Sequence, residues 1–387
     1  MEKKDKNLNV PNLRFPEFSG EWDMKRLGNL VEIRSGVSPS GAIDEEGAYP
    51  FYKVEQLNNC YLELGETPYS TRNSAIPANS IIFPKRGAAI MTNKVRLTSY
   101  PCQLDTNLMA LSIKNNEETD YKFLFYFIER CNLSKIADTS TIPQINNIHI
   151  NPLRISIPLI REQKKISALL MELDQRIETQ KKIIEEYESL IRGISNKLLY
   201  ADNGIPVRLG YLLIERSERT KVNNQHEVLS STVKGIFSQR EYFSKDIASE
   251  NNVGYKVIHR HDVVLSPQNL WMGNINYNDK YDIGIVSPSY KIFSIAEGYD
   301  KRCVAALLKT HRALYNYMQV SEQGASIVRR NLNMEAFEQL TLKMPPLETQ
   351  REIGNAISAL KSRLEISMEM KMVYESQKQW LLMEMFI

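Results

Sequence analysis

One helix opening occurs twice in the chain without a gap, and it constrains the fold more than any other feature of the sequence. The first copy reads PLIREQKKISALL from Pro158, and the second reads PPLETQREIGNAISAL from Pro345. The identical residues at matching positions are Gln163 and Gln350, Ile166 and Ile353, Leu173 and Leu360, Arg176 and Arg363, Glu178 and Glu365, Tyr187 and Tyr374, Glu188 and Glu375, and Ser189 and Ser376. Unrelated amphipathic helices would share apolar positions but not these charged and polar ones, so we infer a tandem duplication.

Each copy also carries a heptad pattern that predicts a long helix. In the first copy the pattern runs through Ile166, Leu170, Leu173, Ile177, Gln180, Ile184, Tyr187, Ile191, Ile194 and Leu198. In the second it runs through Ile353, Ile357, Leu360, Leu364, Ser367, Lys371, Tyr374, Lys378, Leu381 and Met385. A helix from Arg161 to Tyr200 would be about 60 Å long, at roughly 1.5 Å per residue. The polar Gln180 and Ser367 lie at the same level of the two copies, where a polar group can fix helix register.

Before each helix lies a segment rich in short β-type runs and turn residues. The runs SIIFPKRGAAIM (80–91), LMALSI (108–113), DVVLSPQNLWMGNI (262–275) and IGIVSPSYKIFSI (283–295) predict strands joined by turns. Short helical patterns follow at 121–131 and 303–318. We therefore predict an α+β fold with β-rich globular domains at 1–157 and 203–345 and spacer helices at 158–202 and 346–387.

The connectivity predicts how these parts are arranged. A compact second domain would return the chain to the end of the first helix, because consecutive elements are usually neighbours in space. The two helices should therefore form a long antiparallel coiled coil that separates the domains. An internal repeat of this kind has a pseudo-two-fold axis across the rod, and the chain ends should lie close together.

The composition fits a globular protein without a membrane span. Of the 387 residues, 42% are hydrophobic and 25% are charged, which is ordinary for globular domains. The N-terminus, MEKKDKNLN, is polar, and no apolar run approaches the roughly 20 residues that a bilayer span needs. We expect a cytoplasmic location. The four cysteines show no CxxC spacing and predict free thiols rather than a zinc site.

Familiar catalytic motifs are missing from the sequence. It contains no GxxxxGK[ST], no GxGxxG after a strand, no HExxH and no GxSxG. The run HRHD (259–262) could ligate a metal through His259 and His261, but no third ligand is near in the sequence, and an ordinary surface turn is the alternative. We predict no catalytic residue, no metal site and no cofactor in this chain.

The net charge of +3 does not identify a nucleic-acid partner, but the cations are concentrated in particular stretches. No acidic residue lies between Thr67 and Leu104, or from Lys301 to Ser321. We expect DNA contacts from Arg72, Asn73, Lys85, Arg86, Lys94 and Arg96 in the first half, and from Ser231, Thr232, Lys234, Gln268, Asn269, Trp271, Arg329 and Arg330 in the second. Cations and small polar side chains suit phosphates and base edges. The alternatives are a solvated surface, a turn that packs its Trp, and arginines paired with carboxylates.

Two similar modules on a rigid spacer suit a DNA target that is read as two half-sites. Such half-sites lie roughly 34 to 36 Å apart, which is one turn of the double helix. Two other classes remain open. A structural adaptor with two protein-binding domains would show no salt-dependent DNA affinity, and an autonomous nuclease would cleave DNA as the purified chain alone.

Several segments resemble the specificity subunits of type I restriction-modification systems. They are VPNLRFPEFSGEWDMKRLGNLVEIRSG (10–36), TIPQINNIHINPLRISIPLIREQKKI (141–166) and the series VLSSTVKGIF, SPQNLWMGNI and GIVSPSYKIF of the second half. The doubled Pro to Gln-[KR]-x-Ile helix opening is the most specific of these likenesses. The resemblance covers nearly the whole chain.

The resemblance implies a non-catalytic subunit with two target recognition domains, each reading one half of an interrupted double-stranded DNA sequence. It implies two methylation subunits docked largely on the helices and two motor-nuclease restriction subunits. S-adenosylmethionine, ATP and magnesium would belong to those partners. The predicted docking residues are the repeated side chains Gln163, Arg176, Tyr187, Gln350, Arg363 and Tyr374. Recognition domains diverge most where they read DNA, so the resemblance assigns no base contact.

Overall fold

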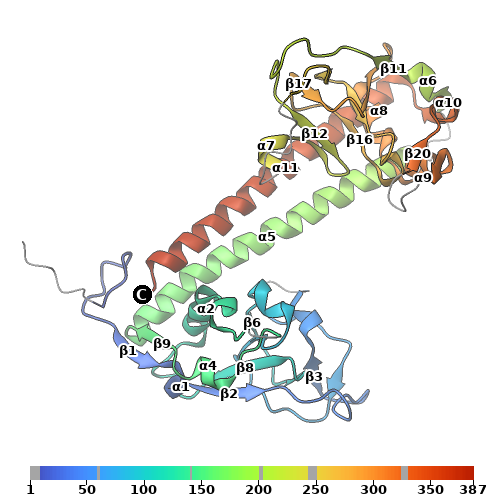
Figure 1. Cartoon of the computed structure of the whole chain (residues 1–387). Coiled ribbons are helices and arrows are strands. Elements are labelled where there is room, and N and C mark those ends of the chain that lie inside the picture. Colours follow the sequence, from blue (N-terminus) through green and yellow to red (C-terminus); the bar gives the residue numbers. More distant parts are fainter. Residues whose placement is uncertain (1–8, 59–61, 140–141, 200–203, 243–250, 324–329) are drawn as a thin grey trace, which may run out of the picture. The chain divides into compact units, whose positions relative to one another are not determined.

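The computed structural model describes residues 9–58, 62–139, 142–199, 204–242, 251–323 and 330–387, and it divides into two compact units. Unit 1 is Met1–Lys182 with Met368–Ile387, and unit 2 is Ile183–Ser367. The long helices α5 (Ile160–Leu199) and α11 (Leu347–Glu384) each contribute residues to both units (Figure 1). The two long helices predicted from the heptad patterns are thereby confirmed. No helix in the described ranges combines the length and apolarity needed to cross a membrane.

Unit 1 contains mixed short strands and helices before α5. Its strands are β1 (Asp23–Arg26), β2 (Val31–Ser35), β3 (Tyr49–Tyr52), β4 (Ser70–Thr71), β5 (Ile81–Pro84), β6 (Arg96–Leu97), β7 (Gln103–Leu104), β8 (Leu108–Ile113) and β9 (Arg154–Ile157). Its helices are α1 (Leu27–Leu30), α2 (Tyr121–Cys131), α3 (Leu133–Ile136) and α4 (Asn147–Ile150), with 3-10 turns η1 (Val54–Asn58) and η2 (Ala88–Thr92). Strand β8 and helix α2 have the predicted bounds.

The core of unit 1 is a four-stranded antiparallel sheet of order β2-β8-β5-β6. Strand β5 is buried along its whole length, which explains its continuous run of apolar residues. Helix α2 packs Phe123 and five following side chains into the same core. Smaller sheets, β1-β9 and β4-β3-β7, complete the unit. The loop that follows β5 therefore lies at one end of this sheet.

Unit 2 is likewise a mixture of short strands and helices, and it also includes a four-stranded sheet. Its strands are β10 (Ile205–Arg208), β11 (Leu213–Arg216), β12 (Leu229–Thr232), β13 (Gly235–Ser238), β14 (Lys256–His259), β15 (Val263–Leu265), β16 (Ile275–Tyr277), β17 (Ile283–Val286), β18 (Lys291–Ile295), β19 (Ser321–Gln323), β20 (Arg330–Leu332) and β21 (Thr341–Met344). Its helices are α6 (Leu209–Leu212), α7 (Gln239–Tyr242), α8 (Lys301–Leu308), α9 (His311–Gln319) and α10 (Met334–Gln339), with the 3-10 turn η3 (Leu270–Met272). Its four-stranded sheet has the order β11-β18-β15-β16, so β15 occupies the place of β5.

The single helical pattern predicted at 303–318 is wrong in one respect, because the structure forms two helices there. Helix α8 ends at Leu308, and Thr310 caps the start of α9 by accepting a hydrogen bond from the Ala313 amide (3.3 Å). A threonine hydroxyl that caps a new helix competes with continuation of the preceding one. The break places Lys309 between the two helices.

Within unit 1 the first half of α5 and the last part of α11 run antiparallel, side by side (Figure 1). The Lys378 ammonium lies 2.8 Å from the Asp174 carboxylate, and the Arg176 guanidinium lies 5.9 Å from the ring centre of Tyr374. Residue numbers therefore rise along α5 as they fall along the adjacent part of α11, as expected for antiparallel helices. The heptad positions of α11 in this unit, including Lys378 and Leu381, are the less exposed ones.

The beginning of the described chain and the end of α11 meet in unit 1, which agrees with the predicted proximity of the chain ends as far as the described residues reach. The Leu13 amide donates to the Glu384 carbonyl of α11 (2.9 Å). Next to it, the Arg14 guanidinium binds both carboxylate oxygens of the buried Glu162 at 2.7 and 2.8 Å. Bidentate geometry of this kind is both strong and directional. The described N-terminal segment is therefore tied to both long helices.

The repeated glutamines Gln163 and Gln350 are buried, so their prediction as docking residues is wrong. Gln163 accepts a hydrogen bond from the Asp120 amide (2.9 Å), and Gln350 accepts one from the Asp300 amide (2.9 Å). Each also donates to the carbonyl of the proline before its helix, at 2.8 and 2.7 Å. Because Asp120 and Asp300 cap α2 and α8, each glutamine fixes a long helix to a domain helix. Its amide is not available to a partner.

Candidate nucleic-acid interface

Equivalent loops in the two units gather the residues best suited to DNA. In unit 1 the loop follows β5, and in unit 2 it follows β15; both strands lie third in their four-stranded sheets. Each loop continues into a 3-10 turn, η2 or η3, which ends at a residue in the left-handed conformation, Asn93 or Gly273. The buried strands β5 and β15 place the two loops at the ends of their sheets.

In unit 1 this loop lies along the segment that precedes α4. The Gly87 amide donates to the Pro143 carbonyl, and the Ile145 amide donates to the Lys85 carbonyl, both at 2.8 Å. Gly87 has a φ of 80° with open space around its α-carbon, a conformation that favours glycine. At the far end, Asn93 holds the turn by donating to the Glu129 carbonyl (2.8 Å). The backbone therefore presents Lys85 and Arg86 from a fixed support.

Lys85 and Arg86 are the cations of this loop that remain available to an anion. Arg86 is exposed, and Lys85 is half-buried. Burial and the adjacent Arg86 lower the pKa of Lys85, whereas Asp105 raises it. Within the described part of the chain, neither side chain forms an ion pair with a carboxylate. Two adjacent unpaired cations favour a phosphate ligand.

The other predicted residues of unit 1 are less available. Arg72 pairs with Asp44 (2.7 Å) and Glu46 (3.4 Å), and the exposed Asn73 follows it after strand β4, in another sheet. Lys94 donates to the Asn58 side chain. Arg96 donates to the backbone carbonyls of Val95 (2.7 Å) and Leu57 (3.0 Å). These three cations already have protein partners, so their contribution to DNA binding stays a prediction.

In unit 2 the structure brings three predicted residues together from distant parts of the sequence. The Arg330 amide donates to the Gln268 carbonyl (3.1 Å), which pairs the loop with β20. The Arg330 guanidinium lies over the Trp271 ring, 4.7 Å from its centre. Gln268 is exposed, and the neighbouring Asn269 is half-buried and accepts two backbone amides within the turn. Arg329 lies outside the described residues.

The β12–β13 hairpin carries a further part of the predicted set, and one member is misassigned. Ser231 is buried and forms hydrogen bonds with Asn274 (2.9 Å) and Asn276 (2.7 Å), so its hydroxyl supports the fold rather than facing DNA. Thr232 is half-buried in the hairpin turn, whereas Lys234 is exposed at its tip. Only Lys234 among these three presents a free polar group to solvent.

Lys309 is a residue that the site prediction missed. Its ammonium donates to the Asn276 side chain (2.5 Å) and to the Val233 carbonyl at the tip of the hairpin (3.4 Å). It therefore joins the hairpin to β16. The acid-free stretch from Lys301 to Ser321 already contained this cation, but its partners depend on the break between α8 and α9.

The histidines of HRHD are held by separate partners. His259 lies 2.8 Å from Glu218, and the Nδ1 atom of His261 lies 2.6 Å from the Tyr277 hydroxyl. In the part of the chain that the structure describes, no group of three or more His, Cys, Asp or Glu side chains could hold a metal ion. Each of the two imidazole rings thus forms a hydrogen bond within the protein, and the two do not form a shared metal site among the described residues.

Comparison with known proteins points to one family. The family model for the type I restriction modification DNA specificity domain matches residues 19–189. The type I restriction enzyme MjaVIII specificity subunit of Methanocaldococcus jannaschii is 23% identical over 259 residues, which cover 65% of this chain and 57% of that relative. The putative MjaX specificity subunit of the same organism is 21% identical, with coverage of 96% and 94%. The chain thus spans little more than half of the first relative.

A solved structure shares the fold. The S subunit of a type I restriction-modification system from M. genitalium superimposes with a TM-score of 0.64 at 16% identity, over 98% of this chain and 99% of that one. The superposition shows a common fold, and at this low identity the individual contacts have to be argued from the residues themselves.

Proposed function

Since the chain belongs to the family of type I restriction-modification specificity subunits, we propose that it reads a two-part DNA target, one half-site per unit. The observation that carries this proposal is the equivalent loop after β5 and β15. In one unit it presents Lys85 and Arg86, and in the other it presents Gln268 beside Trp271 and Arg330. The two loops follow corresponding strands but carry different side chains, which suits the reading of two different half-sites.

The chemistry of each loop suggests what it reads. Adjacent cations such as Lys85 and Arg86 bind phosphates or the acceptor edge of guanine. The amide of Gln268 can pair bidentately with adenine. Trp271 holds the Arg330 guanidinium by a cation–π contact and so limits its freedom before DNA binds. A preorganised arginine loses less entropy on contact.

The internal repeat is part of the proposal. The shared strand order of the two four-stranded sheets and the equivalent clamps of Gln163 and Gln350 support duplication of one recognition domain and one helix. In the proposed arrangement, α5 and α11 act as an antiparallel spacer with a pseudo-two-fold axis, and its length fixes the gap between the half-sites.

We also propose that partner subunits dock on the helices. In unit 1, helix α11 exposes a stripe of apolar side chains: Met370 is 39% exposed, Val373 63%, Trp380 49% and Met383 60%. Their spacing of three and seven residues places them on one side of a helix. Exposed apolar surface of this kind marks a protein interface. Methylation subunits are the proposed occupants, and Arg176, Tyr187, Arg363 and Tyr374 lie on the same pair of helices.

In this proposal the catalytic steps belong to the partners. Two methylation subunits would supply S-adenosylmethionine chemistry, and two motor-nuclease subunits would use ATP and magnesium. The chain itself would contribute binding and spacing, without a reaction of its own. Its localisation in the cytoplasm, where such a complex meets DNA, is part of the same expectation.

The test is a map of methylated adenines in the cell that carries the gene, with the gene intact and deleted. The proposal predicts that one two-part motif with a fixed gap loses methylation on deletion. A second strain carrying Gln268→Ala should change only one half of that motif, because the loop of unit 1 is untouched. An unchanged map, together with no salt-dependent DNA binding by the purified chain, would favour a structural adaptor instead.

A further inference from the structure

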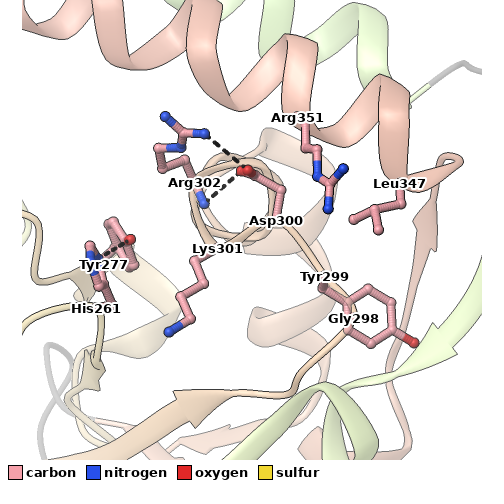
Figure 2. A pocket seen from close by; sticks show the side chains of 9 residues that line it. All are labelled: His261, Tyr277, Gly298, Tyr299, Asp300, Lys301, Arg302, Leu347 and Arg351. Carbon is pink, nitrogen blue, oxygen red and sulfur yellow. Dashed lines mark hydrogen bonds and ion pairs between the residues drawn. The ribbon is translucent and has the colours of Figure 1, made fainter.

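A cavity of about 450 Å³ lies in unit 2 beneath the first turns of α8 and α11 (Figure 2). Four parts of the chain line it: the turn before β15, the end of β16, the start of α8 and the start of α11. The lining residues are His261, Tyr277, Gly298, Tyr299, Asp300, Lys301, Arg302, Leu347 and Arg351. The volume falls within the roughly 300 to 1,000 Å³ of small-molecule sites.

The charges around this cavity are mainly positive. Its acidic side chain, Asp300, is already held by the Arg302 guanidinium (3.1 Å) and by the amides of Arg302 and Cys303 (3.1 and 3.0 Å). Lys301 and Arg351 form no ion pair with any residue that the structure describes. Two cationic side chains from different helices, Lys301 and Arg351, therefore line the same space from different sides, and neither is paired with a carboxylate among the described residues.

His261 and Tyr277 form the opposite wall. The His261 Nδ1 atom lies 2.6 Å from the Tyr277 hydroxyl, and the two rings are stacked with centres 5.7 Å apart. His261 adopts a left-handed φ of 76°, which non-glycine residues rarely do. Burial and the cations Lys301 and Arg260 lower the pKa of His261. The surroundings of the His261 ring thus disfavour its protonated, positively charged form.

The corresponding position in unit 1 is chemically different. Asn79, with a φ of 61°, occupies the turn before β5 as His261 does before β15, and Leu97 ends β6 as Tyr277 ends β16. Tyr121 follows the capping aspartate of α2 where Lys301 follows that of α8. The fold alone therefore does not dictate the histidine, tyrosine and lysine of unit 2.

We propose that this cavity binds a phosphate group through Lys301 and Arg351. A lysine and an arginine provide a point charge and a directional fork, the combination that phosphate oxygens bind well. An adjoining hollow of about 380 Å³, which shares His261, Tyr277 and Arg302, leaves room for the rest of a ligand. The phosphate could belong to a free phosphorylated small molecule or to the DNA backbone.

The cavity lies apart from the loop after β15, which carries Gln268 and is proposed to read DNA. Strand β15 begins next to His261 and ends at the loop that carries Gln268, so the two sites lie at opposite ends of that strand. Three strand residues span about 10 Å. The cavity can thus act independently of the proposed base contacts, and its phosphate binding does not depend on the proposed DNA-reading function.

The first experiment titrates the purified full chain with inorganic phosphate and follows binding by isothermal calorimetry. The double variant Lys301→Gln/Arg351→Gln should weaken phosphate binding by about 100-fold, because each charge-assisted contact contributes about tenfold. The matched control Arg208→Gln/Lys221→Gln removes two exposed cations of unit 2 outside the cavity, and its affinity should be unchanged. The single variant Lys301→Gln, at an exposed position, gives an intermediate loss and guards against misfolding of the double variant.

The second experiment repeats the comparison with a DNA duplex at several salt concentrations. If the cavity holds a backbone phosphate, the double variant should lose affinity relative to its control, and the slope of log affinity against log salt should fall by about 0.9 per phosphate. Phosphate binding that is lost in the variant while DNA binding is unchanged assigns the cavity to a free phosphorylated ligand. No phosphate binding by the unmodified chain, together with equal DNA binding by variant and control, overturns the proposal.

Discussion

Replacing Lys378 by methionine should destabilise unit 1 strongly, because this lysine forms ion pairs with two carboxylates where α11 packs against α2 and α5. Its ammonium lies 2.8 Å from both Glu129 and Asp174, and the Tyr126 hydroxyl donates to Asp174 (2.7 Å). The side chains of Lys378 and Asp174 are only 4% and 1% exposed. Removing the lysine leaves a buried negative charge without its counterion.

The expected loss is about 3 to 5 kcal/mol, which is the usual cost of breaking a buried ion pair from one side. At about 2 to 4 °C per kcal/mol for a unit of this size, the melting temperature should fall by about 6 to 20 °C. The control Lys371→Met, on the same helix, removes a partly exposed pair with Glu375 (2.8 Å). It should cost at most about 1 kcal/mol.

Urea unfolding followed by tryptophan fluorescence can measure this loss in unit 1. The sequence has three tryptophans, and Trp22 is buried in the core of unit 1 against Phe123. In a Trp271→Phe/Trp380→Phe background, the remaining signal reports that core. The triple change Glu129→Gln/Asp174→Asn/Lys378→Met should recover most of the loss, because no buried charge remains.

The loss should also depend on pH. Burial raises the pKa of Glu129, Lys378 lowers it and Asp174 raises it again, so without Lys378 the folded-state pKa rises further. A carboxyl whose folded pKa exceeds its unfolded value destabilises the protein at high pH, and this effect disappears as pH falls toward the ordinary value of 4.5. The gap between Lys378→Met and the unmodified chain should therefore narrow from pH 8 to pH 5. A loss below 1 kcal/mol, or a gap that is constant with pH, would refute the reasoning.

Three further predictions concern DNA. Lys85→Gln/Arg86→Gln should weaken binding to every duplex and lower the salt slope by about 2, whereas Arg72→Gln, which removes an already paired cation, should change little in the same salt titration. Gln268→Ala should relax specificity at one position of one half-site by about 1 to 3 kcal/mol in competition binding; equal loss on all duplexes would assign this residue to the backbone. Insertion of one heptad in both α5 and α11 should add about 10.5 Å and lengthen the favoured gap by about 3 base pairs in a methylation map, and an unchanged gap would count against the spacer role.

The site could be predicted only in part, and the misassigned residues share a cause. Gln163 and Ser231 are polar residues of types that usually lie on the surface. Nothing in their local sequence distinguishes an exposed amide or hydroxyl from a buried one. Gln163 is buried because Asp120, far away in the chain, supplies its partner. The Ser231 hydroxyl is occupied because Asn274 and Asn276 reach it from the segment around β16, which belongs to a different sheet. Whether a polar side chain supports the fold or faces a ligand depends on its hydrogen-bond partners, and only the folded chain brings those partners near.

The sequence by itself determined the features that repeat at short range. Heptad spacing determined α5 and α11, the apolar run 108–113 determined β8, and the gap-free match of the two helix openings indicated the duplication. These depend on periodicity, which a chain carries in its local order of residues. Composition within the basic stretch 67–104 also indicated where to look for DNA contacts.

Only the tertiary structure decided which of those candidates can act. It paired Arg72 with Asp44, gave Lys85 and Arg86 no carboxylate partner among the described residues, and brought Arg330 onto Trp271 from a distant strand. It also placed Lys301 and Arg351, from two different helices, in the lining of one cavity. Ion pairs, cation–π contacts and cavities depend on distances of a few ångströms between residues far apart in the chain, and those distances are set when the core packs.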